Sequence, residues 1–193
     1  IEELGFEYPT TIQEKVIPKI IENSGDVIGL AQTGTGKTAA LSLPVLEKID
    51  TESRGAQALV LCPTRELCLQ IAKDVESYTK YIKGFKVAAI YGGAAYGPQI
   101  KELKSGAQFV AATPGRMADL IEKGKVDFEG LKYLILDEAD IMLNMGFKDE
   151  LDSIVEALPF NRISLLFSAT MPKKIRSLAE KYLDGYEFLK AQE

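Results

Sequence analysis

The sequence predicts an α/β domain in which helices cover both faces of a mainly parallel β-sheet. Six short apolar runs recur along the chain, and each is typical of a buried strand. They span residues 26–30, 58–61, 87–91, 109–112, 133–136 and 164–167. Longer segments with helical spacing separate these runs, and such alternation is typical of parallel sheets built from strand–helix–strand units.

The helical segments are recognised by apolar residues that recur every three or four positions. They include residues 12–21, 66–81 and 173–182. Their apolar stripes would pack on the sheet. In such a sheet, ligands bind at the carboxyl ends of the strands, so the residues that follow each strand are the first candidates for function.

Length and composition predict one domain over residues 1–193. The chain is 46% hydrophobic and 26% charged, which suffices for a full core. No internal repeat, low-complexity tract or long linker interrupts it. The chain begins at Ile1 and not at methionine, which suggests a fragment of a longer protein.

Charge and cysteine content exclude several classes of protein. The net charge of −5 argues against a broad basic surface, so any nucleic-acid site must be local. Histidine is absent, and the spacing of Cys62 and Cys68 fits neither a zinc pair nor a redox pair. No apolar run is long enough for a membrane span, and no signal peptide is visible. We therefore expect a cytoplasmic protein without membrane contact.

A glycine-rich turn follows the first predicted strand. Residues 31–38 read Ala-Gln-Thr-Gly-Thr-Gly-Lys-Thr, and a helix follows them. Such a turn points backbone N–H groups and a helix N-terminus at phosphates. Lys37 would neutralise the β- and γ-phosphates, and the Thr38 hydroxyl would ligate Mg²⁺. The remaining members of the expected phosphate loop are Thr33, Gly34, Thr35 and Gly36. A helix cap that contains Gly-Lys-Thr by chance is the alternative.

Two adjacent carboxylates follow the predicted strand 133–136. We expect Asp137 to hold Mg²⁺ through water, and Glu138 to orient and deprotonate an attacking water. Asp140 could pair with a hydroxyl or a basic group elsewhere. Helix capping is the alternative for these acidic residues. Together with the phosphate loop, they predict a nucleoside triphosphatase with Lys37, Asp137 and Glu138 in catalysis.

These motifs and their order resemble the first RecA-like domain of DEAD-box RNA helicases, over nearly the whole chain. The resemblance implies a RecA-like P-loop fold with ATP and Mg²⁺ as cofactors. Residues 5–13 look like the adenine-reading segment of the family, in which Gln13 would bond the adenine edge and Tyr8 would lie beside the base. Without the resemblance, Gln13 would be read as a solvated helix residue.

Three short motifs after predicted strands would, by resemblance, line a groove for single-stranded RNA. Threonine hydroxyls, helix N-termini, glycines and arginines are suited to contacts with phosphates. Such contacts imply RNA binding that does not depend on base sequence. Taken alone, each motif would more often be an ordinary turn at the end of a strand. The motifs comprise Pro63, Thr64 and Arg65; Gly92 and Gly93; and Thr113, Pro114, Gly115 and Arg116.

The resemblance also implies coupling between the nucleotide site and strand separation through Ser168 and Thr170, which can hydrogen-bond the acidic cluster that includes Asp140. A helix cap is the alternative. In the family, a second RecA-like domain of the same chain supplies arginines to the γ-phosphate, so we expect slow hydrolysis by residues 1–193 alone. Two other functions remain open: a nucleotide-gated RNA clamp without unwinding, and a different P-loop enzyme such as a DNA helicase or transport ATPase. The sequence does not identify protein partners.

Overall fold

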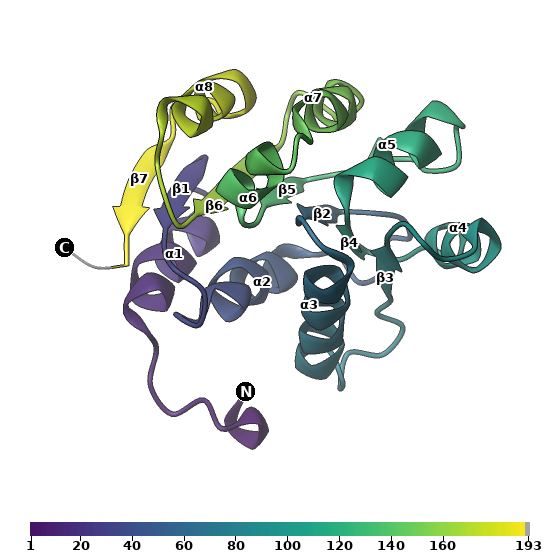
Figure 1. The fold of residues 1–193 in the computed structure, drawn as a ribbon. Helices are drawn as coiled ribbons and strands as arrows, with labels where there is room; N and C mark the ends of the chain where they lie inside the picture. The colour runs from purple at the N-terminus through teal and green to yellow at the C-terminus, as the bar shows by residue number, and fades with distance from the viewer. Residues whose placement is uncertain (192–193) are drawn as a thin grey trace.

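Helices lie on both faces of a seven-stranded parallel sheet in the computed structural model, which describes residues 1–191 (Figure 1). This arrangement confirms the predicted α/β fold. The strands are β1 (Val27–Leu30), β2 (Ala58–Leu61), β3 (Val87–Ile90), β4 (Phe109–Ala112), β5 (Tyr133–Leu136), β6 (Ile163–Ser168) and β7 (Glu187–Lys190). The helices are α1 (Thr11–Ile21), α2 (Lys37–Lys48), α3 (Arg65–Tyr78), α4 (Tyr96–Lys104), α5 (Pro114–Glu122), α6 (Ala139–Asn144), α7 (Lys148–Glu156) and α8 (Lys173–Tyr182), with a 3₁₀ turn at Glu2–Leu4.

All six predicted strands are present, and the seventh, β7, was not predicted. Strand β7 pairs with β1 at one edge of the sheet. Its residues, Glu-Phe-Leu-Lys, are mostly exposed. An edge strand that faces solvent needs no continuous apolar run, so the signal that identified the buried strands is missing here.

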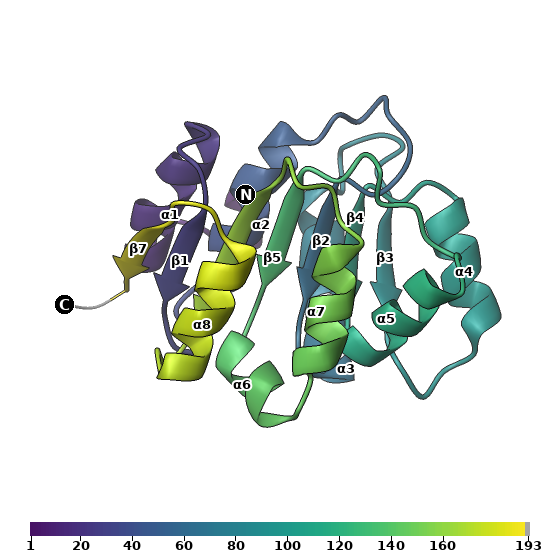
Figure 2. The ribbon, with the colours of Figure 1, turned by 90° about the horizontal axis from the view of Figure 1, so that it is seen from above.

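Two hydrophobic clusters sandwich the sheet. Helices α1, α2 and α3 pack on one face, and α5 to α8 pack on the other, as Figures 1 and 2 show. Helix α4 lies beside the edge strand β3. The central strands β2, β4 and β5 are completely buried, and Phe109 and Phe167 are among the largest fully buried side chains. Burial of this extent is the main source of stability for the fold.

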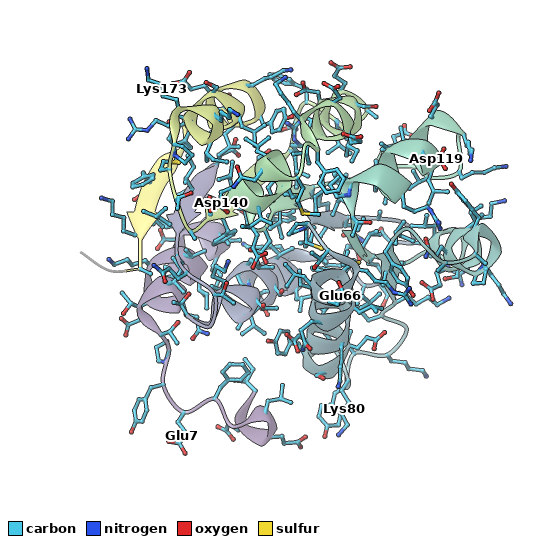
Figure 3. All side chains as sticks on the ribbon, viewed as in Figure 1. Glu7, Glu66, Lys80, Asp119, Asp140 and Lys173 are labelled. Atoms are coloured by element: carbon cyan, nitrogen blue, oxygen red, sulfur yellow. The ribbon has the colours of Figure 1, made fainter. Side chains whose placement is uncertain are left out.

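The strand order is β3-β4-β2-β5-β6-β1-β7, and it divides the sheet into two halves. Strands β5, β6 and β1 are neighbours, and the loops that follow them contain the acidic pair, residues 168–170 and the phosphate loop. Strands β3, β4 and β2 are also neighbours, and the three expected groove motifs follow them. Because all strands are parallel, both sets of loops lie at the same edge of the sheet. Figure 3 views the molecule from this side, with Asp140, Glu66 and Asp119 labelled across it.

A half-buried carboxylate joins α7 to α8 on the face away from α1. Asp152 on α7 accepts a hydrogen bond from the Tyr182 hydroxyl at 2.5 Å and forms ion pairs with Lys148 and Lys181 at 2.9 Å each. Burial opposes the ionisation of Asp152, but the bonds from Tyr182, Lys148 and Lys181 outweigh this effect and lower its pKa below the usual 3.8. Burial also raises the pKa of Tyr182, so its hydroxyl remains a donor.

We expect Asp152→Ala to lower the free energy of unfolding by about 1–3 kcal/mol at pH 7, because the buried Tyr182 hydroxyl loses its acceptor. The pKa of Asp152 is lowered in the folded state. The ionised carboxylate therefore contributes to the free energy of unfolding above pH 3.8, and this contribution is lost as the pH falls through the folded-state pKa. Urea unfolding of wild type and variant at pH 7 and below 3.8 measures this difference. The exposed Lys148→Ala is the control, with a cost below about 1 kcal/mol. Equal stability of Asp152→Ala and wild type at pH 7 would contradict the assignment.

Candidate functional site

The phosphate loop connects β1 to α2 through two glycines in the left-handed region. Gly34 and Gly36 both have φ of 83°, a conformation that costs other L-residues about 1–2 kcal/mol. A Cβ on Gly36 would also lie 2.5 Å from Nε2 of Gln13. Thr35 closes the turn by donating to the Gln32 carbonyl at 2.7 Å. Both positions therefore need glycine for the positive φ, and Gly36 also needs it because a Cβ would collide with Gln13.

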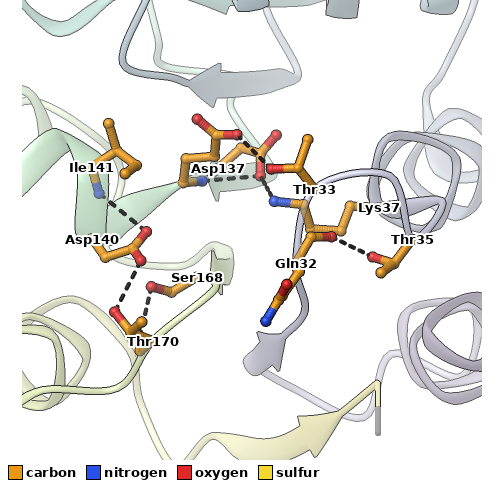
Figure 4. Close-up of polar contacts among 10 residues, drawn as sticks. Gln32, Thr33, Thr35, Lys37, Asp137, Asp140, Ile141, Ser168 and Thr170 are labelled. Atoms are coloured by element: carbon orange, nitrogen blue, oxygen red, sulfur yellow. Dashed lines mark hydrogen bonds and ion pairs between the residues drawn. The ribbon is translucent and has the colours of Figure 1, made fainter.

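Lys37 and Asp137 meet between the phosphate loop and the end of β5. The Lys37 Nζ lies 3.3 Å from Oδ1 of Asp137, and both side chains are almost fully buried. The same carboxylate oxygen accepts the Glu138 N–H at 3.0 Å (Figure 4). Burial raises the pKa of Asp137, and the neighbouring Lys37 opposes the rise. The site thus places a cation and an anion where a phosphate and a metal ion would need partners.

The donor set at this position fits Mg²⁺. Asp137 offers a carboxylate, and Thr38 offers a hydroxyl from the first turn of the neighbouring helix α2. Among residues 1–191, no group of three or more His, Cys, Asp or Glu side chains is arranged to hold a metal. Magnesium does not need such a cage, because it keeps several waters and binds through one or two carboxylates and substrate phosphates.

Glu138 has a strained backbone. Its φ of 53° and ψ of 49° lie in the left-handed region, which costs a residue of this type about 1–3 kcal/mol. The half-buried side chain faces the phosphate loop, where its Oε1 lies 3.5 Å from the Thr33 hydroxyl. Strain of this kind is retained where the surrounding structure imposes it, often at functional sites. The sequence contains no signal for it.

Asp140 and Thr170 are in contact. Oδ2 of Asp140 accepts the Thr170 hydroxyl at 2.9 Å, and Oδ1 accepts the N–H of Ile141 at 3.1 Å (Figure 4). Ser168 differs from expectation, because its buried hydroxyl donates to the Thr170 carbonyl at 2.7 Å and not to the acidic residues. Ser168 therefore shapes the loop, and Thr170 alone bridges to Asp140.

Gln13 lies against the phosphate loop. Its Oε1 accepts the Thr10 N–H at 2.9 Å, which completes a capping box at the start of α1. Its Nε2 donates to the Gly36 carbonyl at 3.2 Å. A glutamine amide has two donors and two acceptor lone pairs, so one of each is left for a ligand. Tyr8, by contrast, is 85% exposed on the segment before α1.

The first groove motif follows β2. Pro63 is buried, and Thr64 begins α3 by accepting the Leu67 N–H at 3.2 Å. Arg65 is exposed, with its guanidinium 4.7 Å from the centre of the Tyr91 ring. The second motif follows β3, where Gly92 and Gly93 are both exposed. Arg65 is thus available to a ligand along the carboxyl edge of these strands.

The third motif corrects one expectation. Thr113 and Pro114 begin α5, and Gly115 is exposed. Arg116 is not a free charge, because its side chain turns inward and is only 9% exposed. It donates to Oε1 of Gln99 at 3.1 Å and to the Ala94 carbonyl at 2.8 Å. The buried Arg116 guanidinium thus bonds internal acceptors and ties α5 to α4 and to the loop after β3.

Three residues that contact the motifs after β2, β3 and β4 were not among the predicted site residues. Tyr91 lies against Arg65, Tyr96 stacks on Arg116 at 3.9 Å, and Gln99 is buried beneath the Gly92–Gly93 turn. The two tyrosines lie on either side of the glycine pair in the sequence, and this position was the signal by which they could have been predicted. For Gln99, the sequence shows only a polar residue on a helix.

No helix in residues 1–191 combines the length and the apolar character that crossing a membrane requires.

Residues 10–178 match the family model described as DEAD/DEAH box helicase. The chain is 50% identical over 188 residues to the ATP-dependent RNA helicase DeaD of Mycobacterium tuberculosis, covering 97% of the chain and 33% of that protein. It is 50% identical over 193 residues to the DEAD-box ATP-dependent RNA helicase CshA of Streptococcus pneumoniae, covering 100% of the chain and 35% of that protein.

Solved structures give the same result. A DEAD box protein from Methanococcus jannaschii superposes with a TM-score of 0.95 at 46% identity, covering 100% of this chain and 52% of that one. A hypothetical ATP-dependent RNA helicase from Sulfolobus tokodaii gives a TM-score of 0.89 at 40% identity, covering 98% of this chain and 54% of that one. The chain therefore spans about a third to a half of the length of these relatives.

Proposed function

Because the chain belongs to the DEAD/DEAH box helicase family, we propose that it is the nucleotide-binding domain of an ATP-dependent RNA helicase. The observation that carries the proposal is the division of the sheet. Of the seven strands, β5, β6 and β1 are followed by the acidic residues, residues 168–170 and the phosphate loop, and β3, β4 and β2 are followed by the three groove motifs. ATP binds the first half, and single-stranded RNA crosses the second.

In the nucleotide half, the amides of residues 33–36 and the cation of Lys37 bind the β- and γ-phosphates. Gln13 reads the adenine with the donor and acceptor that remain free, while Tyr8 lies beside the base. Since Gln13 also holds the Gly36 carbonyl, contact with the base is transmitted to the phosphate loop.

Thr38 and Asp137 would hold Mg²⁺, which when bound would help to neutralise the charge that develops on the transferred phosphoryl group. Binding of the γ-phosphate draws Lys37 away from the carboxylate with which it is paired here. Glu138 then acts as the base that orients the attacking water and accepts its proton. Its backbone conformation aims the side chain at the phosphate loop.

In the RNA half, helix N-termini and exposed glycines contact the phosphodiester backbone. Thr64 and Thr113 begin helices whose N-termini favour anions, and Gly92, Gly93 and Gly115 let a backbone approach closely. Arg65 adds a positive charge, and Pro63, Pro114 and Arg116 support the loops. These contacts do not read bases, so binding is independent of sequence.

Strand β6 lies within the nucleotide half, beside β5, and the Thr170–Asp140 bond joins the loop after β6 to α6, the helix after β5. We assign this bond the coupling of nucleotide state to the RNA half. Turnover also needs a second RecA-like domain, whose arginine at the γ-phosphate is typically worth about a thousandfold or more. The relatives are two to three times as long as this chain, which leaves room for such a domain.

Binding of labelled single-stranded RNA to the full-length protein, with a non-hydrolysable ATP analogue and Mg²⁺, tests the proposal. We expect nucleotide-dependent binding that favours RNA over DNA of the same sequence. Equal affinity for both, or no dependence on nucleotide, would contradict it. A second assay uses a short RNA duplex to distinguish a helicase from the alternative, a nucleotide-gated clamp. Only a helicase would unwind the duplex in an ATP-dependent way.

A further inference from the structure

The Gly92–Gly93 turn is fixed at both ends by side chains from outside it. Gln99 on α4 binds the backbone of Tyr91 on one side, accepting its N–H at 3.3 Å and donating to its carbonyl at 3.0 Å. Arg116 on α5 binds the Ala94 carbonyl at 2.8 Å on the other side. The two glycines between these points have no side chains, and both are exposed.

Gln99 joins these two attachments. Its Oε1 accepts both the Tyr91 N–H and Nη1 of Arg116, the latter at 3.1 Å. The side chain is 5% exposed, so its three bonds form away from water. Through Gln99, the loop after β3 and the helix after β4 become one hydrogen-bonded unit. The Arg65 guanidinium on the Tyr91 ring adds the start of α3, the helix after β2.

A turn of this composition needs such an anchor. Glycine loses more conformational freedom on ordering than any other residue, and Gly93 has a φ of 78°. A Cβ placed on Gly92 or Gly93 would meet no residue beyond its chain neighbours within 4 Å, so no other part of the chain packs against the turn on that side. The hydrogen bonds of Gln99 and Arg116 are the side-chain contacts that hold the two ends of the turn.

We propose that Gln99 is a positioning residue for RNA binding, which holds the Gly92–Gly93 backbone ready for a phosphate and locks Arg116 in its support role. The inference rests on the proposed function, since the phosphate belongs to RNA. Preorganised donors bind more tightly because the ordering cost is met before the ligand arrives. Without Gln99, that cost would be met on binding.

Two variants of the full-length protein test this role. Gln99→Met keeps the size of the side chain and removes all three bonds. Gln99→Glu keeps the acceptor for Arg116 and Tyr91 but places an oxygen against the Tyr91 carbonyl. We expect the RNA dissociation constant to rise about tenfold in the methionine variant and by a smaller factor in the glutamate variant. Amide hydrogen exchange over residues 91–95 should become faster in the RNA-free protein, while exchange in the phosphate loop and ATP affinity stay unchanged.

Gln70→Met, at an exposed glutamine on α3, is the matched control and should leave all these quantities unchanged. Unchanged RNA affinity or unchanged exchange over residues 91–95 in Gln99→Met would overturn the inference. An equal loss of ATP affinity would also overturn it, because Gln99 would then support the whole domain. A wild type that binds no RNA would refute the proposed function itself, and this inference with it.

Discussion

Replacing Glu138 with glutamine is expected to lower ATP turnover of the full-length protein by about a hundredfold to ten-thousandfold, with little change in ATP affinity. Glutamine has nearly the same shape and retains an oxygen for the Thr33 hydroxyl, but it cannot accept a proton from water. The strained backbone of Glu138 presents its carboxylate to the phosphate loop, so the substitution removes the base and leaves the site assembled.

The measurement is the steady-state rate of phosphate release at saturating ATP and RNA, together with ATP affinity. Glu129→Gln is the control, because it removes one exposed carboxylate shortly before β5 and should keep the wild-type rate. Hydrolysis at the normal rate by Glu138→Gln would show that Glu138 does not activate the water.

Replacing Lys37 with alanine is expected to weaken ATP binding about a hundredfold, because the β- and γ-phosphates lose their charged partner. Lys37 is buried at the N-terminus of α2, where no other cation of the described residues pairs with Asp137. Nucleotide affinity is measured by titration of a fluorescent ATP analogue with Mg²⁺.

Two controls accompany this variant. Lys48→Ala removes the same charge from the last turn of α2 and should bind ATP normally. Removing one partner of a buried ion pair destabilises a protein by about 3–5 kcal/mol. Urea unfolding is therefore used to check that the Lys37→Ala variant is folded under the conditions of the titration. Unchanged nucleotide affinity in a folded Lys37→Ala variant would reject the phosphate-loop assignment.

The fold was largely predictable because its signals are local. Each buried strand is a continuous apolar run, and each glycine of the phosphate loop meets a backbone requirement that only nearby residues impose. Strand β7 escaped prediction because an exposed edge strand needs no such run. The strand order also could not be predicted, since it depends on which strands pair across long separations in the chain.

Within the candidate site, residue types were easier to predict than their contacts. A motif suggests that Arg116 meets a phosphate, but a side chain bonds whatever acceptors the fold brings within reach. Here the fold brings Gln99 and Ala94. Likewise, nothing in the sequence shows the left-handed backbone of Glu138, because that strain is imposed by tertiary structure.

The central claim is that this chain holds the nucleotide and part of the RNA groove, and that turnover needs a second domain. The most direct test is the ATPase rate of residues 1–193 and of the full-length protein, each with and without single-stranded RNA. We predict that RNA strongly stimulates the full-length protein, while the isolated chain binds ATP and hydrolyses it very slowly in both conditions. RNA-stimulated turnover by residues 1–193 alone, at a rate near that of the full-length protein, would contradict the claim.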